Sequence, residues 1–288
     1  MENGGSSVPR RQLGRKLREL RESAQLTVAQ AIAALEWSKP RLWRYETGQV
    51  PVHPNDVDAM CRLYGASPDV VEALKSLARE TKSKGWWHAY SEIPEWFQLF
   101  LGMEAVANRI RQYEAEVVPG LLQSLPYARA ILGQSVTQPT DDQLEKQSRV
   151  RMQRQHILTR TSPILEVILS EAALLRGSDG PTMVDQLTTL LAFAERPNIS
   201  IRVVPLSAGP HKAYAGPFVI LDFPRETPAR DPEPTTVYVE QPTGALYLDK
   251  PHEVAAHEAI WLDLVDRVAL GETESRRLIE QRAREWSQ

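Results

Sequence analysis

Two short helical segments joined by a tight turn constrain the fold of this sequence more than any other feature. Thr27 can cap a helix that runs to Leu35, because its hydroxyl oxygen accepts from free backbone N–H groups. Ser38 and Pro40 mark the start of a second helix, since proline fits the first turn, and Gly48 is a typical stop. Two helices joined so closely must pack through their apolar faces, so we expect a helix-turn-helix here.

The surrounding sequence predicts five short helices over residues 10–80, preceded by a disordered tail over residues 1–9. The last two helices each have a capping residue ahead of an apolar stripe. Cys61 falls one turn after Val57, so we interpret it as a core residue rather than a reactive thiol. The residues expected to face inward on the first three helices are Leu13, Leu17, Leu20, Ala29, Ile32, Leu35, Leu42 and Tyr45.

The second helix of the pair, residues 38–47, carries basic side chains beside its apolar anchors. The N-terminal half of such a helix fits the major groove of DNA, which is wide enough for one helix. Long cationic side chains there can reach guanine edges or phosphates, and the free N–H groups of helix N-termini can donate to phosphates. The residues predicted to contact DNA are Thr27, Ser38, Lys39, Pro40, Arg41, Trp43 and Arg44.

Charge is distributed unevenly along the chain, although the formal net charge is only −3. Residues 8–84 hold 14 lysines and arginines against nine acidic residues, whereas residues 85–288 hold 20 against 27. A small basic module attached to a larger acidic one indicates that only the first part binds a polyanion. Chance variation in surface charge is the alternative explanation.

The segment LGRKLRELRESAQLTVAQAIAALEWSKPRLWRYETGQVPV resembles the Xre-type, lambda-repressor-like helix-turn-helix family. The resemblance implies a five-helix domain that binds double-stranded DNA. It also implies that Arg21, late in the first helix, forms a structural ion pair with Glu46, which follows the recognition helix. Glu36 occupies the turn position that is usually glycine in this family, and Pro40 and Trp43 stand where small polar residues are common.

Residues 86–288 are expected to form a mixed α/β domain behind a linker at residues 81–85, which makes the whole chain an α+β protein. Runs rich in β-branched residues predict strands over residues 163–170, 198–205, 216–223, 236–240 and 244–248. Apolar periodicity predicts helices over residues 94–118, 126–133, 141–158, 183–196, 252–269 and 272–286. We assign to this domain a role in regulation and dimerisation, or in partner binding.

Four segments of this second domain, EVVPGLLQSLPYARAIL, PILEVILSEAALLR, RPNISIRVVPLSAGPH and GPFVILDF, resemble an uncharacterised domain of bacterial regulators. That domain follows the same helix-turn-helix in many regulators of filamentous, spore-forming bacteria. The resemblance implies a role in development or antibiotic production, often beside a gene for a small acidic partner protein. It implies no chemical activity.

Two sequence patterns in the second domain invite a chemical interpretation. His252 and His257 are five residues apart, which turns them roughly 140° from each other on a helix, so they are poorly placed to share a zinc ion. The segment 207–218 contains His211, Lys212 and Tyr214 and could close over a small ligand, but a connection between two strands is the favoured interpretation. We therefore expect no catalytic residues, no metal and no cofactor.

The single cysteine excludes an internal disulfide framework, and no apolar run approaches the roughly 18 residues that a membrane span requires. We therefore expect a cytoplasmic, nucleoid-associated protein without a membrane partner. The favoured function is sequence-specific transcriptional regulation by a homodimer on a palindromic operator, because one recognition helix reads only a few base pairs. One alternative is an antitoxin-like or hub protein whose second domain mainly binds a small partner protein. Another is a small-molecule sensor.

Overall fold

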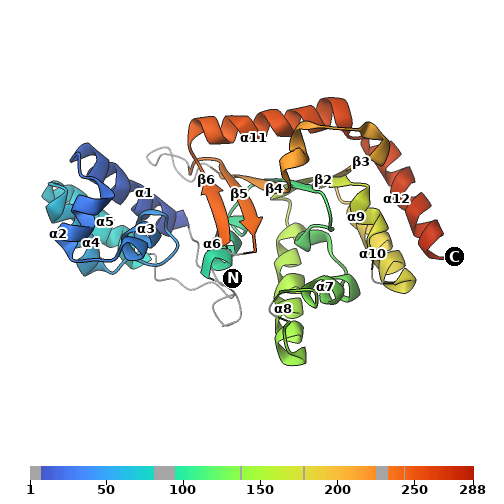
Figure 1. Ribbon diagram of the computed structural model, residues 1–288, viewed down its shortest axis with the longest axis horizontal. Helices are drawn as coiled ribbons and strands as arrows, with labels where there is room; N and C mark the ends of the chain where they lie inside the picture. The colour runs from blue at the N-terminus through green and yellow to red at the C-terminus, as the bar shows by residue number, and fades with distance from the viewer. Residues whose placement is uncertain (1–7, 81–94, 137, 178, 225–232, 243) are drawn as a thin grey trace. The chain divides into compact units, whose positions relative to one another are not determined.

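The computed structural model describes residues 8–80, 95–136, 138–177, 179–224, 233–242 and 244–288 (Figure 1). The chain divides into two compact units, residues 1–106 and residues 107–288, and each is described by itself. The predicted linker at residues 81–85 lies outside the described residues. Among the residues described, no helix is both long and apolar enough to cross a membrane.

The first unit contains the five predicted helices. They are α1 (Val8–Ser23), α2 (Val28–Leu35), α3 (Lys39–Glu46), α4 (Pro54–Leu63) and α5 (Pro68–Glu80). Helix α1 begins at Val8, within the predicted tail. A further helix, α6 (Glu95–Glu104), also belongs to this unit. The helical prediction for the basic module is therefore confirmed.

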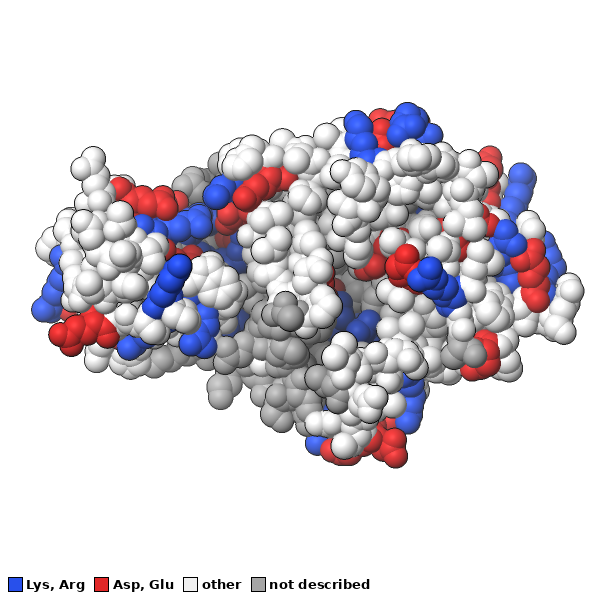
Figure 2. All heavy atoms as spheres, viewed as in Figure 1, with Lys and Arg blue, Asp and Glu red and all other residues white. Residues whose placement is uncertain are grey.

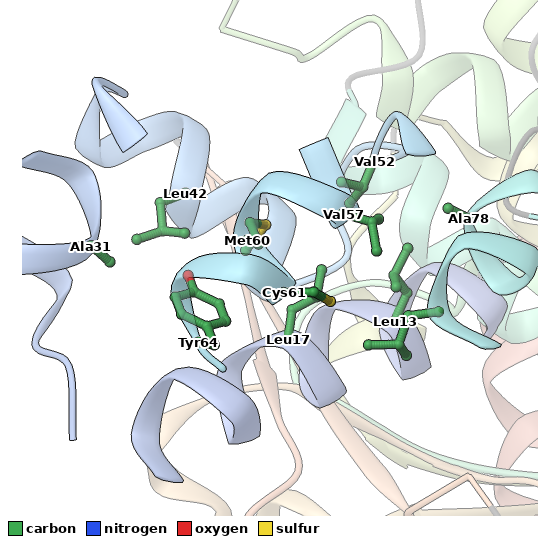
Figure 3. Packing of buried hydrophobic residues seen from close by; sticks show 11 residues of the cluster. Leu13, Leu17, Ala31, Leu42, Val52, Val57, Met60, Cys61, Tyr64 and Ala78 are labelled. Carbon is green, nitrogen blue, oxygen red and sulfur yellow. The ribbon is translucent and has the colours of Figure 1, made fainter. Parts of the chain in front are cut away.

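Buried side chains from all five of these helices meet in one core (Figure 3). Leu42 of α3 and Met60 of α4 are fully buried in it. Cys61 is also fully buried, and desolvation raises the pKa of its thiol to about 11, which confirms its interpretation as a core residue. The prediction for Ala29 is wrong, because Ala29 is exposed and Ala31 is buried in its place.

The error at Ala29 follows from the composition of α2, which is apolar over most of its circumference. Val28, Ala31, Ile32 and Leu35 follow the spacing of a single helical face, and Ala31 is fully buried while the other three pack against the core. Ala29 lies about 100° away from Val28 on this helix, and that position faces solvent.

Two glycines allow α1 to approach the end of α3 closely. A Cβ atom at Gly14 would lie 2.4 Å from the carbonyl oxygen of Tyr45. A Cβ atom at Gly48 would lie 2.8 Å from the backbone of Arg11, and Gly48 also adopts a φ of +69° that disfavours other residues. Backbone atoms rather than flexible side chains block both positions. The packing of α1 against α3 therefore depends on glycine at both sites.

The second unit is built on one six-stranded sheet with the order β3-β2-β1-β4-β5-β6. Strands β1, β2 and β3 are parallel to one another, and β4, β5 and β6 continue the sheet in antiparallel pairs. The strands are β1 (Arg109–Glu114), β2 (Ile164–Ser170), β3 (Ile199–Val204), β4 (Phe218–Asp222), β5 (Thr236–Gln241) and β6 (Gly244–Leu248). All five predicted strands are confirmed, and β1 was not predicted.

The predicted helix over residues 94–118 is confirmed over residues 95–104 and wrong beyond them. Helix α6 ends at Glu104, and residues 109–114 form the central strand β1, which pairs with β2 on one edge and with β4 on the other. Ile110 and Tyr113 are both buried and three residues apart, so they mimic a helical stripe although they lie on opposite faces of the strand. Pairing with neighbouring strands on both edges makes this segment a strand, although its local apolar spacing is typical of a helix.

Helices cover both faces of the sheet. Figure 1 shows α11 (Pro251–Asp263) along one face, and α7 (Leu125–Leu132), α8 (Asp141–Arg154) and α10 (Gly180–Phe193) on the other side. Helix α12 (Glu272–Trp286) packs against α10 and β3. Short helices at 120–122, 155–159, 172–175, 206–208, 212–215 and 264–268 complete the described elements. The predicted α+β fold class is thus confirmed.

Candidate nucleic-acid interface

Local hydrogen bonds define the start of α2 and of α3. The backbone N–H of Gln30 donates to Thr27 Oγ1 at 3.2 Å, and the backbone N–H of Thr27 donates to Gln30 Oε1 at 2.9 Å, so the two residues form a capping box. The backbone N–H of Arg41 donates to Ser38 Oγ at 3.4 Å at the start of α3. Both predicted N-cap residues therefore occupy their expected positions.

The turn between α2 and α3 is tight and closes through the backbone. The N–H of Trp37 donates to the carbonyl of Ile32 at 3.0 Å. Glu36 adopts a left-handed conformation with φ +54° and ψ +39°, which is the conformation that favours glycine at the end of a helix. A residue with a Cβ atom pays about 1–2 kcal/mol there. The glutamate at this position therefore strains the turn.

Helix α3 is anchored on one side and open on the other. Leu42 is fully buried, and the ring of Tyr45 meets the ring of Trp37 edge to face at 5.5 Å. The exposed residues of α3 are Lys39, Pro40, Trp43 and Arg44, and Thr27 and Ser38 are exposed at the two helix starts. Trp43 retains 52% of its surface. Figure 2 shows several lysine and arginine side chains on the visible face of this unit, with acidic side chains among them.

The side chain of Arg41, another predicted contact residue, is held by side chains from outside its own turn of helix. Its Nη2 lies 2.9 Å from both carboxylate oxygens of Asp56, and its guanidinium carbon lies 4.2 Å from the ring centroid of Trp37. The hydroxyl of Tyr45 donates to Asp56 at 2.7 Å. Desolvation and this hydrogen bond raise the pKa of Tyr45, so the hydroxyl stays a donor. The Arg41 side chain is nevertheless 42% exposed.

Asp56 is not among the predicted contact residues. An acidic residue in the first turn of α4 is fully explained by the helix dipole, so its position carries no sign of a second role. Its partner Arg41 is 15 residues away on another helix. Only the packing of α4 beside α3 brings the two side chains together.

A buried ion pair fixes the far end of α3. Arg21 donates from Nε and Nη2 to the two oxygens of Glu46 at 2.6 and 2.9 Å, and both side chains are less than 10% exposed. Arg21 also donates from Nη1 to the carbonyl of Leu26 at 2.9 Å. The bond to Glu46 raises the pKa of Arg21 above its usual value. This pair ties α1 to α3 and holds α3 in place.

The three residues of the candidate ligand loop do not converge. The ring of His211 packs edge to face against Tyr113 at 5.9 Å. Lys212 lies 3.7 Å from Asp263, whereas Tyr214 points into solvent with 88% of its surface exposed. The segment connects β3 to β4.

Two histidines of α11 also have identifiable surroundings. His257 Nδ1 lies 2.9 Å from the carbonyl of Glu253 within the same helix, and its ring contacts Phe218. His252 is exposed. Within the described ranges, no group of three or more histidine, cysteine or acidic side chains could hold a metal ion.

Comparison with known proteins gives two matches. Residues 12–74 match the family described as a helix-turn-helix domain, and residues 97–281 match the family described as a domain of unknown function (DUF5753). No curated protein and no solved structure shows significant similarity to the chain. The first match agrees with the geometry of α2 and α3 and identifies a DNA-binding module. Because the second match covers more than half of the chain, the protein belongs to the DUF5753 family and carries a helix-turn-helix domain ahead of the family's own domain.

Proposed function

We propose that this protein is a sequence-specific transcriptional regulator of the Xre type that inserts α3 into the major groove of its operator. The main observation behind this proposal is that one face of α3 is anchored in the core and the other face is exposed. Leu42 fixes the helix in the core, while Lys39, Arg41 and Arg44 remain at least partly exposed. Basic side chains on a rigid helix are the standard means of reading a groove and binding its phosphates.

The operator is expected to be palindromic and the protein a homodimer. A single recognition helix contacts only a few base pairs, so affinities of about 10⁻⁸ to 10⁻¹¹ M generally require two copies on a two-fold site. The DUF5753 domain then receives the signal, either as a dimerisation element or by binding a small acidic protein. The regulator acts by binding alone, without a chemical step, in processes such as bacterial development.

A gel-shift titration on the native promoter tests the proposal. The double variant Arg41→Ala/Arg44→Ala should lose about 100-fold in affinity. The slope of log affinity against log salt concentration should become less steep by about one to two. A matched control, Arg62→Ala/Arg79→Ala, removes the same charge from α4 and α5, and it should lose much less. Equal losses in the two double variants would remove α3 from the interface.

A second candidate function, small-molecule sensing, is favoured by one observation. A cavity of about 390 Å³ lies beside β2 and β3, which is within the size range of ligand sites. Its lining includes Glu166, Ser200, Arg202, Trp261 and Glu272. A thermal-shift screen of metabolites tests this candidate. A compound that raises the melting temperature of the wild type should lose its effect in Ser200→Leu, whose larger side chain enters the cavity, and keep it in Ser287→Leu.

A further inference from the structure

Three side chains from different elements hold the guanidinium of Arg41. Asp56 of α4 accepts from Nη2 with both oxygens at 2.9 Å. Trp37, in the turn, lies under the guanidinium carbon at 4.2 Å, and the ring of Tyr45 in α3 lies at 5.6 Å. Because an arginine side chain has many rotamers, contacts on two sides remove most of its freedom.

The holding group is itself fixed. The hydroxyl of Tyr45 donates to Asp56 Oδ2 at 2.7 Å, which orients the carboxylate. The rings of Trp37 and Tyr45 meet at 84°, so each ring limits the movement of the other. The plane of the Arg41 guanidinium is therefore set by the protein before any ligand arrives.

Part of the guanidinium still faces outward. The hydrogen bonds to Asp56 involve only Nη2 of Arg41, and the side chain is 42% exposed. Nη1, which carries two of the five N–H groups of an arginine, makes no bond to Asp56. Arg41 thus combines a fixed plane with donors that remain available to an external acceptor.

We propose that Asp56 is a positioning residue that makes Arg41 a reader of guanine rather than a phosphate contact. The inference rests on the proposed insertion of α3 into the major groove. Guanine presents two acceptors, O6 and N7, in one plane, and a guanidinium of fixed orientation matches this pair. The Asp56 charge also offsets that of Arg41, so the pair contributes little to the general attraction of phosphates.

The substitution Asp56→Asn should therefore move two properties in opposite directions. Arg41 loses its orientation, so the preference for guanine at one operator position should fall roughly tenfold. Arg41 also loses its counter-charge, so binding to unrelated DNA should strengthen. The slope of log affinity against log salt concentration should become steeper by about one. A merely structural role of Asp56 would weaken both kinds of binding together.

The matched control is Asp58→Asn, two residues further along α4. Asp58 pairs with Arg62 at 2.7 Å, so this substitution also releases an arginine from its carboxylate on the same helix. It should leave the preference for guanine unchanged, and it should change the salt dependence less than Asp56→Asn does, because Arg62 is not among the predicted contact residues. The comparison separates the loss of a negative charge from the loss of orientation.

The experiment uses the full chain and an operator selected from random duplexes. Affinities for that operator, for variants with each guanine replaced by adenine, and for unrelated DNA are measured across a salt series. In an Arg41→Ala background, Asp56→Asn should no longer affect the base preference. If Asp56→Asn does not fold, Tyr45→Phe, which removes only the hydroxyl donated to Asp56, should reduce the same preference several-fold.

Two outcomes would overturn different claims. A wild-type chain that selects no DNA sequence would overturn the proposed function, and with it the claim that Arg41 reads guanine. A wild-type chain that selects an operator, with an unchanged guanine preference in Asp56→Asn or in Tyr45→Phe, would overturn the role of Asp56 alone. The same holds if the effect of Asp56→Asn persists without Arg41.

Discussion

Each of the two units contains a buried arginine in an ion pair, Arg21 in the helical unit and Arg111 in the sheet unit, and the two side chains are bonded differently. Arg21 of the helical unit gives Nε and Nη2 to a single buried partner, Glu46, only 25 residues away. Arg111 of the sheet unit shares Nη2 between Asp222 of β4 and Glu258 of α11, which are 111 and 147 residues away. Its Nε is buried without an acceptor among the described residues.

The difference shows how each unit uses its ion pair. The Arg21 pair is enclosed, all three guanidinium nitrogens of Arg21 donate a hydrogen bond, and its two residues are close in the sequence, so the pair makes a rigid local frame under α3. The Arg111 pair joins β1 to β4 and α11, and its two carboxylates are 24% and 44% exposed. Water can therefore replace some of the hydrogen bonds that Arg111 donates to these carboxylates. We expect the stability of the sheet unit to depend less on Arg111 than that of the helical unit depends on Arg21.

The largest expected effect is the loss of one partner of the enclosed pair. Arg21→Ala leaves the buried Glu46 carboxylate without its bonds and should lower the free energy of unfolding of the helical unit by about 3–5 kcal/mol. Chemical denaturation followed by circular dichroism measures this change. Arg21→Met combined with Glu46→Leu removes both charges and should recover most of the loss. A loss below about 1 kcal/mol in Arg21→Ala would show that the enclosed pair is dispensable.

The next effect concerns pH and the sheet unit. Desolvation raises the pKa of Glu114 in β1 to about 7. The folded state therefore holds this proton more tightly than the unfolded state, so stability is highest below the ordinary carboxyl pKa and falls as the pH rises towards 7. Glu114→Gln imitates the protonated form, and at pH 8 it should be more stable than the wild type by up to about 3 kcal/mol.

Amide hydrogen exchange of β1 and β2 at pH 5 and pH 8 measures this difference within the sheet unit. The exposed Glu274 of α12 provides the control, since Glu274→Gln should leave the pH dependence of exchange in place. If Glu114→Gln shows the same pH dependence as the wild type, Glu114 is not the titrating group.

A third prediction tests the comparison of the two arginines directly. Arg111→Met should destabilise the sheet unit by only about 1–2 kcal/mol, because its partners can be rehydrated. Arg109→Met on the same strand should cost less than 1 kcal/mol, because Arg109 and Glu166 form a more exposed pair. Unfolding free energies from urea titrations rank the variants. A cost for Arg111→Met equal to that of Arg21→Ala would remove the contrast between the units.

The smallest expected effect is a gain of stability. Glu36→Gly relieves the left-handed conformation in the α2–α3 turn and should stabilise the helical unit by about 1 kcal/mol, which raises its melting temperature by about 4–8 °C. Glu36→Ala removes the same charge but keeps the Cβ atom, so it should not gain. Equal melting temperatures of the two variants would assign the effect to charge instead of backbone strain.

The parts of the fold that sequence reasoning predicted are those that depend on neighbours in the chain. Thr27, Ser38 and Gly48 act on backbone groups within a few residues, so the limits of α2 and α3 could be predicted. The short strands bounded by proline and glycine could be predicted for the same reason. The exposed basic face of α3 followed from the same local periodicity.

The missed parts depend on residues far apart in the chain. Strand β1 is determined by β2 and β4, which begin at Ile164 and Phe218, and its polar residues on both faces hide the alternation of a strand. The contact of Asp56 with Arg41 requires the packing of α4 on α3, and no local pattern encodes it. The wrong prediction for Ala29 has a different cause. Helix α2 is rich in alanine, so its composition alone does not show which face is buried.

The central place of β1 in its sheet has a consequence for synthesis on the ribosome. The contacts among α1 to α5 lie within the first 80 residues, so these helices can assemble as soon as that length has emerged. Strand β1 emerges early but pairs with a strand that lies about 110 residues later. At about 5–20 residues per second, one edge of β1 waits for several seconds without its partner. A nascent chain can therefore carry the assembled DNA-binding helices α1 to α5 while one edge of β1 is still unpaired. We expect chaperones to matter most at this stage, because an unpaired strand edge can pair with other chains.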